Sequence, residues 1–289
     1  MTKKSLDKSK KGQESKTKKA HNGKTAWEIV MISRHHKRPV MQDYISLIFD
    51  NFIELHGDRY YADDLAIVGG FAELNGQKLM LIGHSKGKDT NENIKRNFGM
   101  ARPEGYRKAL RLMRLAERFN IPIVTIIDTP GAFPGMEAEQ RGQAESIAKN
   151  ITEMAKIEVP IVAVVIGEGG SGGALGIGVG DKILMLSNAI YSVISPEGCA
   201  SILWRDAKYA PDAAEALNIT ADSLLDLGVI DEIIPEPKDG AHTDYKKTAE
   251  AVKKAVLKNL KSLENLSVDK LLDNRADKYA GMGKFSTDN

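Results

Sequence analysis

Hydrophobic and polar stretches alternate along the chain in lengths that suit strands and helices. Residues 121–128 (IPIVTIID) and 160–166 (PIVAVVI) are short, continuous apolar runs, which predicts strands buried on both faces. Residues 103–119 open with Pro103 and predict a helix before the first of these strands. Residues 136–155 predict a second helix between the two strands. Strands that alternate with helices of this length predict an α/β fold with a largely parallel sheet.

The flanking segments extend this pattern. Residues 25–55 carry apolar residues at helical spacing, and Pro39 divides them into two predicted helices. Two apolar runs flank Asn75-Gly76, which predicts a β-hairpin. Further predicted elements are a strand at 182–194, helices from 211 and 221, and a strand at 229–234; the stretch SPEGCASILW (195–204) comes before these helices. Near the C-terminus, Val252, Val256, Leu260 and Leu263 form an apolar helical face, which must pack against the body or another subunit.

Charge is distributed unevenly along the chain. Residues 1–24 hold nine lysines and two acidic residues, so the remainder is mildly acidic although the whole 289-residue chain has a net charge of +2. The basic segment is almost free of apolar residues, which predicts a disordered tail at 1–24. An acidic body does not suggest a surface that binds nucleic acid.

The chain has a single cysteine, Cys199, which excludes an internal disulfide and a cysteine-based zinc site, and we expect it to be buried and inert. The basic start is not followed by the apolar core of a secretory signal. The nearly uncharged stretch 159–180 has the length of a membrane span, but its glycines and Glu168 favour a buried strand followed by a turn. We expect a soluble cytoplasmic protein that does not enter a membrane.

Candidate chemistry centres on the glycine run at 167–176, GEGGSGGALG. It matches the dinucleotide fingerprint, but the acidic residue that binds a ribose is expected about 20 residues on, where the sequence NAIYSVIS (188–195) has no acid until Glu197. It also matches the elbow of a serine hydrolase at Ser171, for which only His84 or His242 could serve as the base. Packing of a helix on a sheet would explain one or two of the glycines.

A third interpretation needs only backbone. Where a strand ends and a helix begins, the first N–H groups have no partner within the helix and can stabilise an anionic oxygen. Gly172 and Gly173 have no side chains to cover these groups. A second strand-to-helix loop, DTPGAFPG (128–135), precedes this turn; it resembles a GTPase switch, but the chain has no phosphate-binding P-loop. Adjacent turns at the carboxyl ends of parallel strands would form one crevice.

Long motifs identify the chain as a member of a known family. The sequence resembles the alpha-subunit family of bacterial acetyl-CoA carboxylase carboxyltransferases over about residues 25–260. The motifs that carry the resemblance are ELHGDR (54–59), RPEGYRKALR (102–111), DTPGAFPG (128–135), AEQRGQAESIA (138–148), VIGEGGSGGALGIGVGD (165–181), YSVISPEGCASILW (191–204) and LGVIDEIIPEP (227–237).

The resemblance implies a crotonase-like (ClpP-like) fold, a spiral of ββα units, with N-terminal helices and a C-terminal helical extension. We expect the carboxyltransferase domain at 25–260 and the extension at 261–289. The family pairs this chain with a separate beta subunit, which carries a zinc ribbon, in an α2β2 assembly. A biotin carboxyl carrier protein bears the biotin cofactor, and a partner biotin carboxylase uses ATP to charge it. The implied reaction moves the carboxyl group from carboxybiotin to acetyl-CoA, giving malonyl-CoA for fatty-acid synthesis.

Combining the resemblance with the backbone argument gives the expected site. The N–H groups of Gly172 and Gly173 would be catalytic, holding the ureido oxygen of biotin as carbon dioxide leaves. Biotin would lie against the glycine loops, at Gly131, Phe133, Gly135, Gly169 and Gly170. Within a group of loop cations, Lys86, Arg102 and Arg107 would bind the acetyl-CoA substrate. We expect no metal in this chain. The alternatives are a non-catalytic docking subunit for the beta chain and another acyl-CoA carboxyltransferase or decarboxylase of the same superfamily.

Overall fold

The computed structural model describes residues 23–283. Residues 1–22 and 284–289 lie outside this range, so the predicted disorder of the basic tail falls almost entirely on residues that the structure does not describe. None of the helices in residues 23–283 combines the length and the apolar composition that are needed to cross a membrane.

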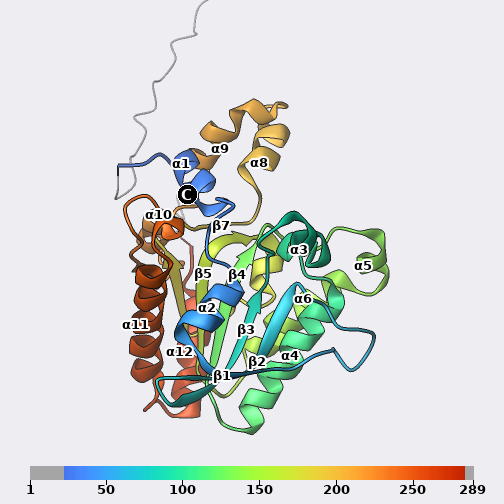
Figure 1. The fold of residues 1–289 in the computed structure, drawn as a ribbon, viewed down its shortest axis with the longest axis vertical. Helices are drawn as coiled ribbons and strands as arrows, with labels where there is room; N and C mark the ends of the chain where they lie inside the picture. The colour runs from blue at the N-terminus through green and yellow to red at the C-terminus, as the bar shows by residue number, and fades with distance from the viewer. Residues whose placement is uncertain (1–22, 284–289) are drawn as a thin grey trace, which may run out of the picture.

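An eight-stranded sheet forms the centre of the described chain (Figure 1). β7 (Ile190–Ser192) pairs with the end of β5, off the main path of the sheet. The neighbours along that path are β1 (Asp50–Glu54), β2 (Ile67–Leu74), β3 (Gln77–His84), β4 (Ile123–Thr129), β5 (Ile161–Gly170), β6 (Lys182–Leu186) and β8 (Glu232–Ile234).

The hairpin predicted at Asn75-Gly76 joins β2 to β3. The two strands pair antiparallel from Ile67 opposite His84 to Leu74 opposite Gln77. Asn75 and Gly76 have φ of 55° and 79°, the two positive values that the favoured hairpin turn requires. The hairpin prediction is confirmed.

From β3 onward every strand runs parallel to its neighbour, which confirms the predicted parallel sheet. α4 (Pro103–Arg118) connects β3 to β4, and α6 (Gln143–Met154) connects β4 to β5. The carboxyl ends of parallel strands meet at one edge of the sheet. The loop after β4 and the glycine run after β5 therefore lie at the same edge.

Helices cover both faces of the sheet. A Cβ at Gly69 would lie 2.6 Å from a Leu112 methyl group of α4, whereas one at Gly83 would lie 2.7 Å from the Met41 sulfur of α2 (Met41–Ile48). Since these positions face opposite ways, α4 and α2 pack on opposite faces. α11 (Tyr245–Leu263) contacts α2 and β5, so its predicted apolar face packs on the body.

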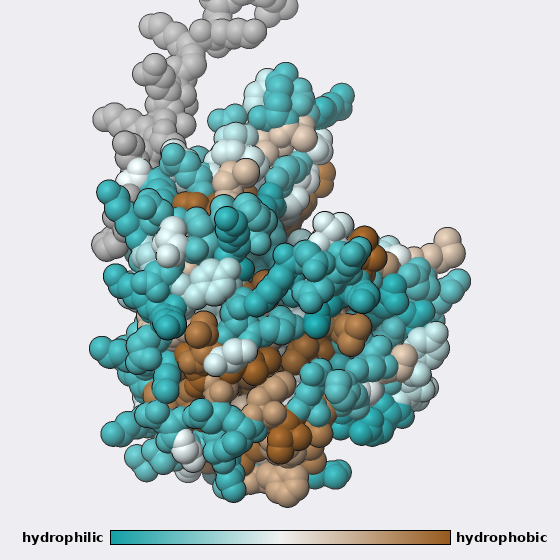
Figure 2. Space-filling view, in the orientation of Figure 1, coloured by the Kyte–Doolittle hydropathy of each residue, from teal (hydrophilic) through white to brown (hydrophobic). Residues whose placement is uncertain are grey.

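An arm stands above the carboxyl edge of the sheet (Figure 1). It consists of α8 (Pro196–Leu203) and α9 (Ala210–Ala216), and α1 (Ala26–Ser33) packs against α9. Figure 2 shows the surface hollowed between this arm and the side of the body that carries α3 (Thr90–Lys95) and α5 (Met136–Gln140). The remaining helices are α7 (Ser171–Leu175), α10 (Ala221–Asp226), α12 (Val268–Ala280) and the 3-10 turns η1 (Asn97–Gly99), η2 (Ala207–Tyr209) and η3 (Ala241–Thr243).

The C-terminal helix α12 is fixed to the body by one buried arginine. Arg275 is 1% exposed and donates from Nε to Asp181 Oδ1 (2.8 Å) and from Nη1 to the Met154 carbonyl (2.8 Å). It also donates to the carbonyls of Ile157 and Val159. The preceding helix, α11, runs through residue 260, the boundary that the sequence analysis expects between domain and extension.

Three predicted elements differ from the structure. Residues 50–54, expected to be helical, form edge strand β1. The strand predicted at 182–194 divides into β6 and β7, which pair with different stretches of β5. The helix predicted at 136–155 is interrupted at Gly142, whose φ of 83° is incompatible with a continuous right-handed helix.

Candidate functional site

The two glycine loops meet at the carboxyl edge of the sheet, as the sequence predicts. A Cβ at Gly170 would lie 2.2 Å from the Pro130 carbonyl oxygen, and one at Gly173 would lie 2.4 Å from the Gly131 carbonyl carbon. Both distances are far below a van der Waals contact. These glycines therefore let the loop after β4 pack directly on the turn after β5.

Close packing also explains three neighbouring glycines. A Cβ at Gly167 would lie 2.4 Å from Asp128 Oδ1, one at Gly169 would lie 2.7 Å from the Tyr191 ring, and one at Gly176 would lie 2.5 Å from the Tyr106 ring. Packing thus accounts for more of the run than the one or two glycines expected from the sequence.

Gly172 is the exception in the run. A Cβ at this position would meet only the Ile147 side chain, at 3.7 Å and 3.9 Å, which is ordinary contact. Packing therefore does not require a glycine at position 172, which is half-buried at the surface of the turn. The absence of a side chain at Gly172 therefore leaves room for a ligand to approach the backbone.

The N–H groups of Gly172 and Gly173 lie in the first turn of α7, where an α-helix has no acceptor for them. Neither group donates a hydrogen bond to another atom within residues 23–283. The other side of the Gly173 residue is held, because its carbonyl accepts from the Tyr106 hydroxyl at 3.2 Å. The turn thus holds two adjacent unbonded donors on a fixed backbone, one on the half-buried Gly172 and one on the buried Gly173.

Ser171 precedes these donors with a left-handed backbone, φ 53°. A serine nucleophile needs a histidine within hydrogen-bond reach. Both ring nitrogens of the buried His84 lack a hydrogen-bond partner in the described chain, so His84 does not contact the Ser171 hydroxyl. His242 stacks on His35, with ring centroids 3.8 Å apart. The geometry of a hydrolase triad is not present among these residues.

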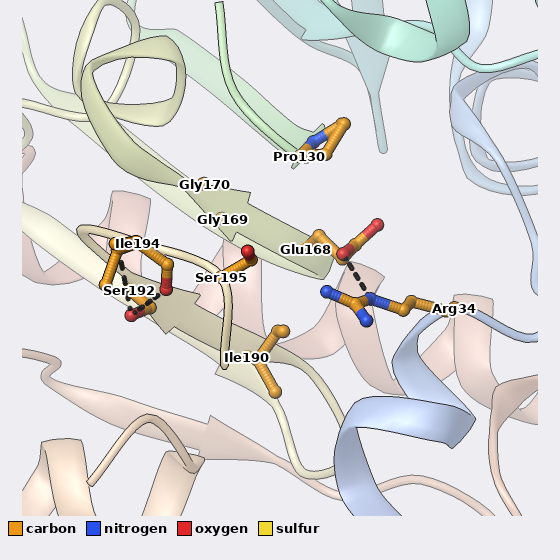
Figure 3. Close-up of a pocket in the computed structure, with 9 residues that line it drawn as sticks. All are labelled: Arg34, Pro130, Glu168, Gly169, Gly170, Ile190, Ser192, Ile194 and Ser195. Carbon is orange, nitrogen blue, oxygen red and sulfur yellow. Dashed lines mark hydrogen bonds and ion pairs between the residues drawn. The ribbon is translucent and has the colours of Figure 1, made fainter. Parts of the chain in front are cut away.

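A chain of ion pairs, of which Figure 3 shows the Arg34–Glu168 contact, lies at the base of the site. Glu168 lies between two cations, with Oε1 2.7 Å from Arg34 Nε and Oε2 3.1 Å from Lys86 Nζ. Lys86 Nζ also contacts Asp128 Oδ1 at 2.7 Å, and Arg34 Nη1 contacts Glu197 Oε1 at 2.5 Å. These contacts join α1, β4, β5 and α8.

The charges in this network hold one another ionised. Burial raises the pKa of Glu168, but Lys86 and Arg34 outweigh it and keep that pKa below the ordinary value. Burial lowers the pKa of Lys86, but Asp128 and Glu168 outweigh it and raise that pKa. Glu168 therefore remains an ionised, fully engaged carboxylate, which is unsuited to act as a general base.

A small pocket of about 30 Å³ lies beside the network, beneath the arm (Figure 3). Gly169 and Gly170 line it from β5, Pro130 from the loop after β4, and Ser192 and Ser195 from the segment leading into α8. This volume can hold one or two water molecules. Any larger ligand must lie mainly in the open hollow beside the arm.

The loop predicted to hold biotin is close to Arg102. The guanidinium carbon of Arg102 lies 4.7 Å from the centroid of the Phe133 ring, and Nη2 is 3.7 Å from Glu137 Oε1. The Phe133 N–H donates to the Ala101 carbonyl at 3.0 Å. A Cβ at Gly135 would lie 2.3 Å from the Phe133 ring, so Gly135 lets this ring lie flat against the loop.

The three predicted substrate-binding cations are not together. Lys86 is engaged in the ion-pair network, and Arg107 Nε is 2.8 Å from Asp58 Oδ2, in the segment between β1 and β2. Arg102 is the one of the three whose side chain is half-exposed beside the glycine loops, at 35%. Sequence reasoning missed Arg34, since its acidic partner Glu168 is 134 positions away. Within residues 23–283, no cluster of histidine, cysteine or acidic side chains could hold a metal ion.

Comparison with known proteins adds a family to this geometry. A family model described as acetyl co-enzyme A carboxylase carboxyltransferase-like matches residues 1–283. The acetyl-coenzyme A carboxylase carboxyl transferase subunit alpha of Nitrosomonas europaea is 57% identical over 269 residues, which cover 93% of this chain and 84% of that protein. The protein of the same name from Methylococcus capsulatus is 58% identical over 269 residues, which again cover 93% of this chain and 84% of that protein.

Solved structures of low sequence identity share the fold. The transcarboxylase 12S core aligns with a TM-score of 0.61 at 21% identity, over 79% of this chain and 44% of that one. The chain therefore spans less than half of the length of that neighbour. A chain of a Pseudomonas malonate decarboxylase hetero-tetramer aligns with a TM-score of 0.61 at 17% identity, over 75% of this chain and 88% of that one. The predicted crotonase-like fold is confirmed.

Proposed function

This chain belongs to the alpha-subunit family of acetyl-CoA carboxylase carboxyltransferases, and from that premise we propose that it transfers a carboxyl group to acetyl-CoA, giving malonyl-CoA for fatty-acid synthesis. It is a transferase component of a multisubunit acetyl-CoA carboxylase. Two observations on the same turn support a catalytic rather than a purely structural role. The N–H groups of Gly172 and Gly173 donate no hydrogen bond in the described chain, and packing does not require a glycine at position 172.

These two N–H groups have the chemistry that biotin requires. Biotin, carried in its carboxylated form on a separate protein, supplies the carboxyl group. Its ureido oxygen needs hydrogen-bond donors when negative charge develops there, and Gly172 and Gly173 offer two such donors on a rigid turn. Because Tyr106 anchors the Gly173 carbonyl, the donors need little rearrangement to receive the charge.

Other residues shape the surroundings of these donors. Gly169 and Gly170 form the floor, where any side chain would collide with Tyr191 or with Pro130. Gly131, Phe133 and Gly135 form a wall against which the biotin ring would lie. Arg102 stacks on that wall and has an exposed cation, which suits the carboxylate or a phosphate of the acyl-CoA. Lys86 acts through Glu168 and Asp128, whereas Arg107 lies outside this wall.

We place the complete site at an interface with a beta subunit, in an α2β2 assembly in the cytoplasm. The beta subunit would hold the acetyl-CoA enolate with a glycine pair of its own. A biotin carboxyl carrier protein would deliver the carboxyl group, and a biotin carboxylase would reload it with ATP. The hollow beside the α8–α9 arm (Figure 2) would give the carrier access to the glycine turn.

The direct test is reconstitution. The chain is co-purified with the beta subunit, and the complex is supplied with malonyl-CoA as donor and free biotin as acceptor. We expect malonyl-CoA-dependent carboxylation of biotin by the complex and none by the chain alone. A complex that forms without carboxylating biotin would contradict the proposal and leave the chain as a docking subunit. Decarboxylation of malonyl-CoA without biotin would favour a decarboxylase of the same superfamily.

A further inference from the structure

A second pocket lies between the helix pair α4 and α6 and the loop that precedes β2. Its volume is about 240 Å³, which is larger than the pocket beneath the arm. Cationic side chains of Arg59, Arg107, Arg111 and Lys149 line it, together with Asp58 and Asn150. Four cations face one carboxylate on a body that is otherwise mildly acidic.

The one carboxylate is fully occupied. Asp58 Oδ1 accepts the N–H groups of Tyr60, Tyr61 and Ala62 at 2.9, 2.7 and 3.1 Å. Asp58 Oδ2 accepts from Arg107 Nε at 2.8 Å. Burial raises the pKa of Asp58, but these backbone donors and Arg107 outweigh it and lower that pKa. Asp58 therefore forms its ion pair with Arg107 and not with the other three cations of the pocket.

Arg59 and Arg111 are held beside each other by one carbonyl. Arg59 Nη1 donates to the His56 oxygen at 2.7 Å, and Arg111 Nη2 donates to the same oxygen at 3.2 Å. Arg111 Nε is bonded to the Gly57 carbonyl at 3.0 Å. Within residues 23–283, no carboxylate forms an ion pair with Arg59, Arg111 or Lys149. Burial and the neighbouring Arg59 lower the pKa of Arg111, as expected for like charges placed together.

We propose that this pocket binds the phosphate or diphosphate group of a small molecule. Three uncompensated cations call for a ligand with more than one negative charge, and the planar forks of two arginines match phosphate oxygens. Asn150 adds an acceptor, because its Nδ2 is bonded to the Tyr106 and Gly176 carbonyls while its buried Oδ1 has no donor in the described chain. That acceptor suits a hydroxyl next to the phosphate, as in a sugar phosphate or nucleotide.

The proposal is tested by calorimetric titration of the full chain with inorganic pyrophosphate. Two variants remove charge with little disturbance. Lys149→Gln alters an exposed side chain of α6, and Arg59→Asn suits the left-handed backbone of that residue, φ 67°. We expect each to weaken pyrophosphate binding about fivefold to tenfold, with binding that weakens as salt rises. The matched control, Lys254→Gln on an exposed position of α11, should bind as the unmodified chain does.

Two sources of phosphate are distinguished in the assembled enzyme. If Lys149→Gln raises KM for acetyl-CoA, the phosphate belongs to the acyl-CoA; if KM is unchanged while pyrophosphate binding is weakened, the pocket serves a separate phosphate ligand. Absence of saturable pyrophosphate binding at millimolar concentration, or equal binding by Lys149→Gln and Lys254→Gln, would overturn the proposal. Because the titration does not involve turnover, its outcome is independent of the carboxyl transfer proposed above.

Discussion

At the residue scale, the turn before the two free donors contains a strained serine. Ser171 has φ 53°, a left-handed conformation that costs a residue with a side chain roughly 1–2 kcal/mol. The glycines on either side of it have no positive φ. The residue of this turn whose backbone conformation most favours glycine is therefore the serine.

Replacing Ser171 separates strain from chemistry. Ser171→Gly should raise the free energy of unfolding by about 0.5–1 kcal/mol, because relief of strain exceeds the added entropy of the unfolded chain. Ser171→Ala keeps the strain and removes the hydroxyl, and it should leave carboxyl transfer nearly unchanged. Denaturant unfolding and malonyl-CoA formation measure the two effects. Loss of all activity in Ser171→Ala would instead favour a serine nucleophile.

His84 lies buried near the same turn, with both ring nitrogens unpartnered in the described chain. Burial and the charge of Lys86 lower its pKa to about 3 from 6.5, and the nearby Gly173 backbone opposes this shift only weakly. Since the unfolded chain gains a proton on this residue below about pH 6.5 and the folded chain does not, stability falls as the pH drops from 6.5 toward 3.

His84→Leu should remove this component. Between pH 7 and pH 5 the unmodified chain should lose about 2 kcal/mol more stability than the variant, and the variant should be no less stable at pH 7, where two unpaired nitrogens have been deleted. Urea unfolding at the two pH values measures the difference. Equal losses in the two proteins would show that His84 titrates normally in the fold.

Residue types alone indicate where the site lies but not which glycine is free. The run at 167–176 and the loop at 128–135 are visible in the sequence. That Gly170 and Gly173 are required by the approach of Pro130 and Gly131, while Gly172 is not, depends on residues about 40 positions away. The pairing of Arg34 with Glu168 depends on a still longer separation, which no local pattern encodes.

At the scale of elements, the sequence predicted helices and strands correctly where a single local feature of the sequence determines the structure. Continuous apolar runs predicted β4 and β5, Pro103 predicted the start of α4, and Asn75-Gly76 predicted the hairpin. Residues 50–54 were wrongly expected to be helical, because their apolar spacing is ambiguous and the β1 pairing with β2 overrides it. The division of 182–194 is likewise a tertiary effect, since β5 offers both pairing partners.

The C-terminal helix tests how a buried charge fixes an element. Arg275→Met would leave Asp181 without its charged partner and would remove the Arg275 hydrogen bonds to three carbonyls, of which only that of Met154 keeps another backbone donor in the described chain, the Ile157 N–H. We expect a loss of about 3–5 kcal/mol in the free energy of unfolding. Lys270→Met, at an exposed position of the same helix, is the matched control. Similar stabilities of the two variants, measured in urea, would show that α12 is attached mainly by its apolar contacts.

At the scale of the whole molecule, the sheet and the arm position the glycine turns, and the two pockets lie at different places on the body. The parallel strands bring both glycine loops to one edge, and the ion pairs from Arg34 to Glu197 tie the arm to that edge. The cationic pocket lies on the α4–α6 side instead. In the account proposed here, one subunit offers two donors for an anionic oxygen and a separate place for a phosphate, while a beta subunit would supply the enolate site.

The measurement that tests the central claim most directly is the kcat of the assembled enzyme with Gly172→Val. A Cβ here meets only Ile147 at ordinary contact distance, so we expect the fold to tolerate the substitution while the branched group blocks access to the N–H pair. We predict a fall in malonyl-CoA formation of about a hundredfold, or ~3 kcal/mol of barrier, with unfolding like that of the control Ala148→Val on α6. A kcat close to that of the unmodified enzyme would contradict the assignment of these donors to catalysis.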